Sequence, residues 1–132
     1  DFDYERYPDA ADHPLKGAEE LRRRGYDESF VRAVLSHADY LGLARNTNAE
    51  KTLVAVDELC GLIMATAMVM PGRSLAEVTA EAVLKKMKSK GFARKVNRED
   101  IVRGTEGLGI PLETHVSNVV RALQGIAATL GL

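Results

Sequence analysis

The chain of 132 residues suits one domain and is long enough to bury a core without disulfide bonds. Its 18 Lys and Arg residues nearly balance its 19 Asp and Glu residues, so net charge favours neither nucleic acid nor a membrane surface as a partner. The single cysteine, Cys60, excludes an internal disulfide and favours a reducing compartment, so we expect the cytoplasm.

The first third of the sequence predicts two helices and a loop. Pro14 starts a helix that runs to Gly25, with apolar residues at helical spacing on one face. Asp27 caps a second amphipathic helix, which has His37 in its last turn. Residues 39–48 are polar and predict a loop.

The third predicted helix is long and strongly apolar. It opens at a capping box formed by Thr47 and Glu50 and stops at a proline-glycine pair. Its segment Leu53–Met70 approaches the length of a membrane span. Two adjacent acids, Asp57 and Glu58, would each cost roughly 2.5 kcal/mol or more in hydrocarbon. We therefore expect a buried helix and no membrane association.

Three further start signals predict helices in the second half, at Ser74, Asn97 and Pro111. No segment alternates like a strand, and no internal repeat or linker divides the chain. The sequence therefore predicts an all-α fold, a single-domain bundle of about six helices that covers residues 1–132.

Asp57 is the acid with the most informative surroundings. Its helical neighbours are apolar or small, namely Leu53, Val56, Cys60, Gly61 and Met64. We therefore expect its carboxylate to face the interior, where it requires a cation, hydrogen bonds or a proton. Two interpretations stay open: a metal ligand, or a salt bridge to an arginine such as Arg32 or Arg45 in a non-catalytic binding or regulatory module.

Two histidines are candidates to bind a cation together with Asp57. His13 lies at the entry of the first predicted helix and His37 at the exit of the second. Antiparallel helices joined by a short turn bring those ends together, so the two imidazoles are expected to converge. Imidazole together with carboxylate suits a divalent first-row ion. His115 has no comparable context and is expected on the surface.

Four short motifs, DFDYE, HPLKGAEEL, AVLSHAD and AVDELCG, occur in an order that resembles the HD-domain superfamily of metal-dependent phosphohydrolases. The chain is most similar to the small bacterial and archaeal members, and the similarity extends over KKMKSKGFARKVNRED and the closing helix. By this resemblance Asp1 matches the Asp of the His-Asp pair, His13 and His37 the intermediate histidines, and Asp57 the late Asp. On this match the chain begins one residue inside the motif and lacks the N-terminal helices of the HD domain.

The resemblance also implies an activity and a metal site for the intact protein. It implies hydrolysis of a nucleotide or other small phosphate ester at one or two divalent ions, drawn from Mn, Fe, Co, Ni, Zn and Mg. Asp1 and Asp57 are expected to be the catalytic anionic metal ligands. His13 and His37 are expected to bind a second ion or to donate to the phosphate.

Four more residues are candidates because of their positions near these ligands in the sequence. Asp3 and Glu5 lie close to Asp1 and are expected to orient a ligand or relay a proton. Arg45 and Lys51 flank the start of the Asp57 helix and are expected to contact the substrate phosphate.

The remaining features have simpler interpretations. A basic segment is expected to be a solvated helix face, and its cations are Lys85, Lys86, Lys88, Lys90, Arg94, Lys95 and Arg98. Aromatic residues that could stack on bases are nearly absent there, so nucleic acid is not expected as a partner. The methionines of the long helix are expected in the core, and formation of a homo-oligomer through the last helix stays open.

Overall fold

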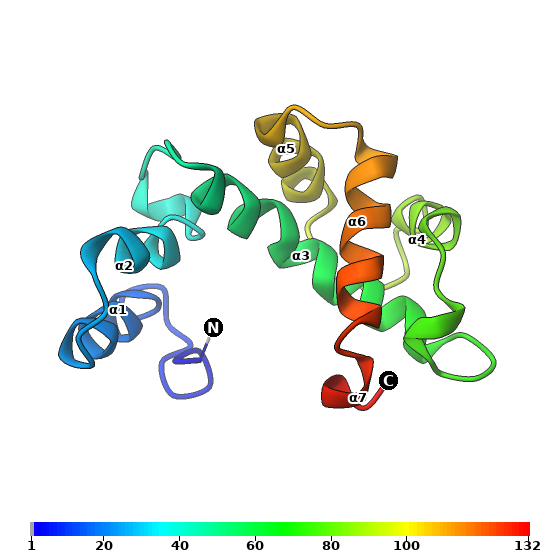
Figure 1. Ribbon diagram of the computed structural model, residues 1–132, viewed down its shortest axis with the longest axis horizontal. Coiled ribbons are helices and arrows are strands. Elements are labelled where there is room, and N and C mark those ends of the chain that lie inside the picture. The colour runs from blue at the N-terminus through cyan, green and yellow to red at the C-terminus, as the bar shows by residue number, and fades with distance from the viewer. Residues whose placement is uncertain (1) are drawn as a thin grey trace. The chain divides into compact units, whose positions relative to one another are not determined.

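The computed structural model describes residues 2–132, and over these residues it contains helices and no strands. The helices are, in chain order, α1 (Leu15–Arg23), α2 (Glu28–Leu35), η1 (Asp39–Leu41), α3 (Asn48–Met68), η2 (Leu75–Glu77), α4 (Ala80–Met87), α5 (Arg98–Leu108), α6 (Leu112–Gln124) and α7 (Ala127–Leu130). Figure 1 shows their course, and η1 and η2 are single 3₁₀ turns. The predicted all-α class is confirmed.

The contacts between residues divide the chain into two compact units, Asp1–Leu53 and Val54–Leu132. Helix α3 begins in the first unit and continues into the second. The single-domain organisation expected from the sequence stays a prediction.

In the first unit, α1 and α2 pack against each other around a small core of Ala18, Leu21 and Val31. The turn between them follows from local chemistry. Gly25 adopts a positive φ of 83°, which glycine tolerates at no steric cost. Asp27 then accepts a hydrogen bond from the backbone N–H of Phe30 and caps α2.

In the second unit, a larger core forms where α3 packs with α6 and the segments around it. Its fully buried side chains from α3 include Leu59, Leu62 and Ile63, and α6 adds the stripe Val116, Val119, Val120 and Leu123. Helix α6 also contacts α4, α5 and η2. The spacing of the α6 stripe is that of one helical face.

Two helix boundaries differ from those expected. Ser74 accepts from the N–H of Ala76 but starts only the 3₁₀ turn η2, because buried Val78 then takes an extended conformation. Thr79 caps α4 by accepting from the N–H of Ala82. The last predicted helix is divided into α6 and α7 at residues 125–126.

The expected inward orientation of Asp57 is wrong, because its side chain is exposed. The buried residues of α3 recur at helical spacing, as in Ala55, Leu59 and Leu62. Asp57 lies two positions from Ala55 and from Leu59, which is about 200° around the helix from each. Since α3 is apolar on most sides, the neighbours of Asp57 did not reveal which side faces the core.

The expectation that Leu53–Met70 does not span a membrane agrees with the structure. Within residues 2–132, no helix combines the length and the hydropathy that a membrane span requires.

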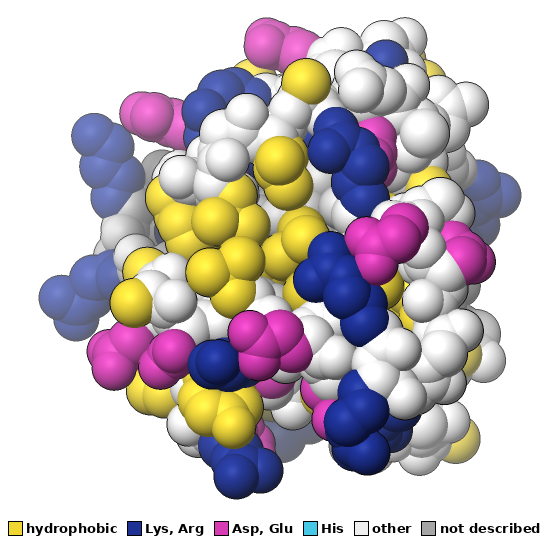
Figure 2. All heavy atoms as spheres, turned by 90° about the vertical axis from the view of Figure 1, so that its left-hand side faces the viewer, with side chains coloured by type: hydrophobic (Ala, Val, Ile, Leu, Met, Phe, Trp, Pro, Cys, Tyr) yellow, Lys and Arg dark blue, Asp and Glu magenta, His cyan; other side chains and the backbone are white. Residues whose placement is uncertain are grey.

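The surface carries apolar as well as charged groups. Figure 2 shows one face on which hydrophobic side chains gather in the middle, with Lys, Arg, Asp and Glu around them.

Candidate functional site

The imidazoles of His13 and His37 meet within the first unit. The Nε2 atom of His13 lies 3.2 Å from the Nε2 atom of His37, and the ring centroids are 5.3 Å apart. His13 lies in the turn before α1, and His37 lies in the turn that follows α2. The packing of α1 against α2 therefore brings the two rings together, as expected from the sequence.

The other nitrogen of each ring is held by an acceptor. The Nδ1 atom of His13 lies 3.0 Å from Oδ1 of Asp3, and the Nδ1 atom of His37 lies 2.5 Å from the Val34 carbonyl oxygen. A carbonyl and a carboxylate only accept, so both Nδ1 atoms carry the proton. In the neutral rings, each Nε2 atom then carries the lone pair, and these two atoms lie 3.2 Å apart.

Asp3 is fixed by the start of α1. Its side chain is only 6% exposed, and its Oδ2 accepts from the backbone N–H of Gly17 at 2.9 Å. A Cβ atom at position 17 would lie 2.7 Å from Cγ and Oδ2 of Asp3. The carboxylate can therefore approach α1 only because residue 17 is glycine, a role that the sequence pattern did not indicate.

Two tyrosines complete the surroundings of His13. The hydroxyl of Tyr40 donates to the His13 carbonyl oxygen, and the Tyr4 ring meets the imidazole edge-on at 5.3 Å. Burial raises the pKa of the Tyr40 hydroxyl, and the charge of Asp3 adds to this rise. Neither role was expected from the sequence, and Tyr40 lies within residues 39–48, which were predicted only as a loop.

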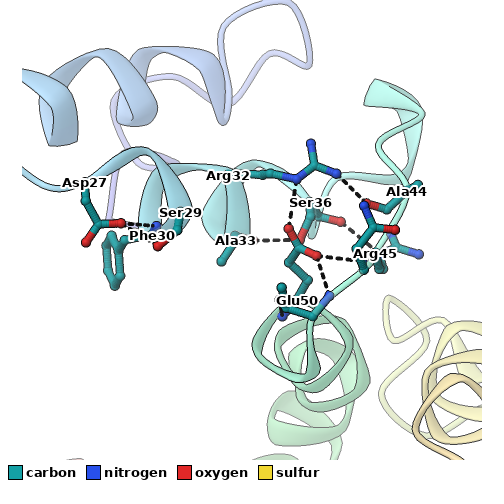
Figure 3. A network of polar contacts seen from close by, with 11 residues as sticks. Asp27, Ser29, Phe30, Arg32, Ala33, Ser36, Ala44, Arg45 and Glu50 are labelled. Atoms are coloured by element: carbon teal, nitrogen blue, oxygen red, sulfur yellow. Dashed lines mark hydrogen bonds and ion pairs between the residues drawn. The ribbon is translucent and has the colours of Figure 1, made fainter.

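A buried carboxylate orders the segment that leads from α2 to α3 (Figure 3). Glu50 accepts from the backbone N–H groups of Asn46 and Thr47 at 2.7 and 2.9 Å, and its Oε1 lies 3.0 Å from Nε of Arg32. Arg32 also donates to the Ala44 carbonyl oxygen. The capping box predicted from Thr47 and Glu50 is confirmed, and Arg32 ties it to α2.

Arg45 also acts within this segment. Its Nε donates to the Ser36 carbonyl oxygen at 3.0 Å, and its guanidinium forms an ion pair with Asp39. These contacts hold the turn that carries His37. The expected contact of Arg45 with a substrate phosphate stays a prediction. The ion pairs described for Arg32 and Arg45 are with Glu50 and Asp39 and not with Asp57.

The donors of this site fit a divalent first-row ion. Metal–nitrogen bonds of about 2.0–2.1 Å at tetrahedral or octahedral angles place two imidazole nitrogens roughly 3 Å apart. The observed 3.2 Å matches that spacing. Histidines that bind metals also donate the other ring N–H to a carboxylate or a carbonyl, as His13 and His37 do here.

Among the described residues, the structure brings no further expected metal ligand to the two histidines. Within residues 2–132, no group of three or more His, Cys, Asp or Glu side chains is arranged to hold a metal ion. Asp1 lies outside the described residues. Asp57 is exposed in the second unit, Glu5 is exposed, and Lys51 is half-buried in the first turn of α3. The roles expected for these residues stay predictions.

The expected surface position of His115 is wrong. Its side chain is buried, and its Nε2 lies 2.9 Å from the Ala55 carbonyl oxygen in α3. His115 follows Leu112 by three residues and precedes Val119 by four, so it lies on the apolar stripe of α6. That spacing could have revealed its burial from the sequence.

Comparison with known proteins adds no identification. No family model matches the chain, and no curated protein or solved structure matches it. The resemblance to HD-domain phosphohydrolases therefore stays a hypothesis, which depends on the four motifs and on the chemistry of the His13 and His37 pair.

Proposed function

We propose that this chain contributes His13 and His37 to a divalent metal site and that the intact protein is a metal-dependent phosphohydrolase. The observation that carries the proposal is the 3.2 Å approach of the two Nε2 atoms while both Nδ1 atoms are held by acceptors. The substrate class is a nucleotide or another small phosphate ester, as the resemblance implies.

The residues of the chain have distinct roles in this proposal. His13 and His37 hold the ion through Nε2, and the carboxylate of Asp3 makes His13 a stronger donor to it. A bound divalent cation would favour ionisation of a water molecule and offset negative charge on the phosphoryl group. Asp1 and Asp57 are proposed as further anionic ligands on the strength of the resemblance alone.

Replacing each histidine by glutamine tests the metal site. Equilibrium dialysis against Mn²⁺ and Co²⁺ measures affinity, and phosphate release from a panel of nucleotides and sugar phosphates measures activity. We expect His13→Gln and His37→Gln to bind metal at least about 10-fold more weakly and to lose activity in the same proportion. His115→Gln is the matched control, because its amide can still donate to the Ala55 carbonyl and should leave metal binding unchanged.

Three outcomes separate the alternatives. Equal metal content in the wild type and in His13→Gln would refute the metal site, and a proton shared between the imidazoles would then account for the pair. Metal binding without hydrolysis of any substrate would favour the alternative, a non-catalytic binding or regulatory module with a vestigial site. Equal metal content in the wild type and in Asp57→Ala would count against Asp57 as a ligand and would leave the two histidines in place.

A further inference from the structure

The segment that joins α4 to α5 concentrates positive charge. Residues 82–98 contain no acid and seven cations, namely Lys85, Lys86, Lys88, Lys90, Arg94, Lys95 and Arg98. The whole chain has a formal net charge of −1, so this concentration is local. Only Lys85 and Lys86 lie on α4, which ends at Met87, so the segment is mainly a connecting loop rather than the expected helix face.

Arg98 holds this loop in one shape. Its guanidinium donates to the carbonyl oxygens of Ala93 at 2.8 Å, Val96 at 2.7 Å and Ser89 at 3.4 Å, and also to that of Phe92. The loop is thus organised around one cation that faces its own backbone. Four of the other six cations lie on this loop, and Lys85 and Lys86 lie on α4 just before it.

The six remaining cations are not neutralised by acids. Five of them are exposed, and Lys86 lies over the Phe92 ring at 4.7 Å. Among the described residues none of the six forms an ion pair. Two acids beside the segment have other partners, since Glu58 accepts from the Asn97 N–H and Asp100 pairs with Arg103. The cations of α1 and its C-cap differ, because Lys16, Arg22, Arg23 and Arg24 all pair with glutamates.

The larger apolar side chains of the segment are partly buried against the core. Leu84, Met87, Phe92 and Val96 pack against the core of the second unit. A membrane-surface segment needs an apolar face to insert, and protein interfaces are depleted in lysine and centred on apolar or aromatic anchors. A surface whose exposed side chains are mainly cations suits a partner that presents phosphate groups.

We propose that the α4–α5 loop binds the phosphate backbone of nucleic acid, without reading its sequence. Clustered lysines and arginines release condensed counterions when they contact phosphates, which supplies affinity that depends on salt rather than on bases. Phe92 lies beneath Lys86 and is partly buried against the core, so we do not expect bases to stack on it. The site is independent of the His13 and His37 pair and of the proposed hydrolysis.

Fluorescence anisotropy with labelled duplex DNA and RNA of mixed sequence tests this proposal. The variant Lys88→Gln/Lys90→Gln/Arg94→Gln/Lys95→Gln keeps side-chain length and removes four exposed charges. We expect at least about 10-fold weaker binding at low salt and a slope of log affinity against log salt reduced by up to about 3.6. The variant Lys16→Gln/Arg22→Gln/Arg23→Gln/Arg24→Gln removes the same charge from α1 and is expected to bind as the wild type does.

The proposal fails if the wild type does not bind either duplex. It also fails if the α1 variant loses as much affinity as the loop variant does, since net charge alone would then explain the binding. Equal or tighter binding to polyglutamate or to phosphatidylserine vesicles at the same salt would also overturn it, because the backbone of nucleic acid would not be the preferred partner. Circular dichroism checks that both variants keep their helices. Unchanged Mn²⁺ binding by the loop variant separates this site from the proposed metal site.

Discussion

At the scale of single residues, Gly17 links the first turn of α1 to the candidate metal centre, which is the pair of His13 and His37. Its backbone N–H donates to Asp3, and its missing side chain leaves room for the same carboxylate. Asp3 in turn holds Nδ1 of His13. Asp3 and His13 therefore keep their positions because residue 17 lacks a Cβ atom.

Gly17→Ala should weaken metal binding although alanine is the better helix former. The new Cβ atom would lie 2.7 Å from the buried carboxylate of Asp3, which must move and release His13. We expect Mn²⁺ or Co²⁺ affinity, measured by calorimetry, to fall about 10-fold or more.

Gly107→Ala provides the matched control in α5. Nothing lies within 4 Å of its added Cβ atom, so the usual stabilisation of about 0.5–1 kcal/mol for alanine over glycine in a helix should appear. If Gly17→Ala showed the same stabilisation and full metal affinity, the contact between Gly17 and Asp3 would not be needed for metal binding.

At the scale of elements, Glu50 joins the start of α3 to α2. Hydrogen bonds from the backbone N–H groups of Thr47 and Asn46 lower the pKa of Glu50 below its ordinary value of 4.5, and Arg32 adds to this effect. The folded state thus favours the ionised carboxylate. This contribution to stability is complete above about pH 4.5, and it is lost as the pH falls toward the lowered folded-state value.

Glu50→Gln should lower the midpoint of thermal unfolding by several degrees at neutral pH, because Arg32 loses its charged partner. It should also reduce the loss of stability on acidification below about pH 4.5. Thermal unfolding at a series of pH values measures both effects. Glu106→Gln, at an exposed position of α5, is expected to change neither midpoint nor pH profile. Identical pH profiles for wild type and Glu50→Gln would contradict the role given to this carboxylate.

At the scale of the whole molecule, the two units have cores of different size. The first unit encloses Ala18, Leu21 and Val31, whereas the second encloses a much larger cluster centred on α3 and α6. Regions with few buried apolar contacts open locally at lower free energy than the main core. The candidate metal centre lies in the unit with the smaller core.

Hydrogen exchange should therefore be slowest in the amides of α6 and of α3 around Leu59–Ile63, and faster in α1 and α2. Adding Mn²⁺ should slow exchange in α1 and α2 selectively, because a ligand that binds only the folded form stabilises it. Mass spectrometry of deuterated peptides resolves these segments. Equal slowing throughout the chain, or none, would speak against a metal site in the first unit.

The helices were predictable because their determinants are local. Caps such as Asp27 and the Thr47–Glu50 box act within one turn, and apolar spacing marked the faces of α1, α2 and α6. The meeting of His13 and His37 followed from a short helical hairpin, which is also local. The extended conformation at Val78 was missed, since burial of that side chain depends on neighbours from other helices.

The sequence by itself determined the all-α class, most helix boundaries and the pairing of two imidazoles. Only the tertiary structure decided that Asp57 faces solvent, that Nε2 of His115 meets the Ala55 carbonyl oxygen and that Arg98 organises the basic loop. The physical reason is the same for all three residues. Helical periodicity shows which residues share a face, but the packing partners determine which face is buried and which polar atoms meet there.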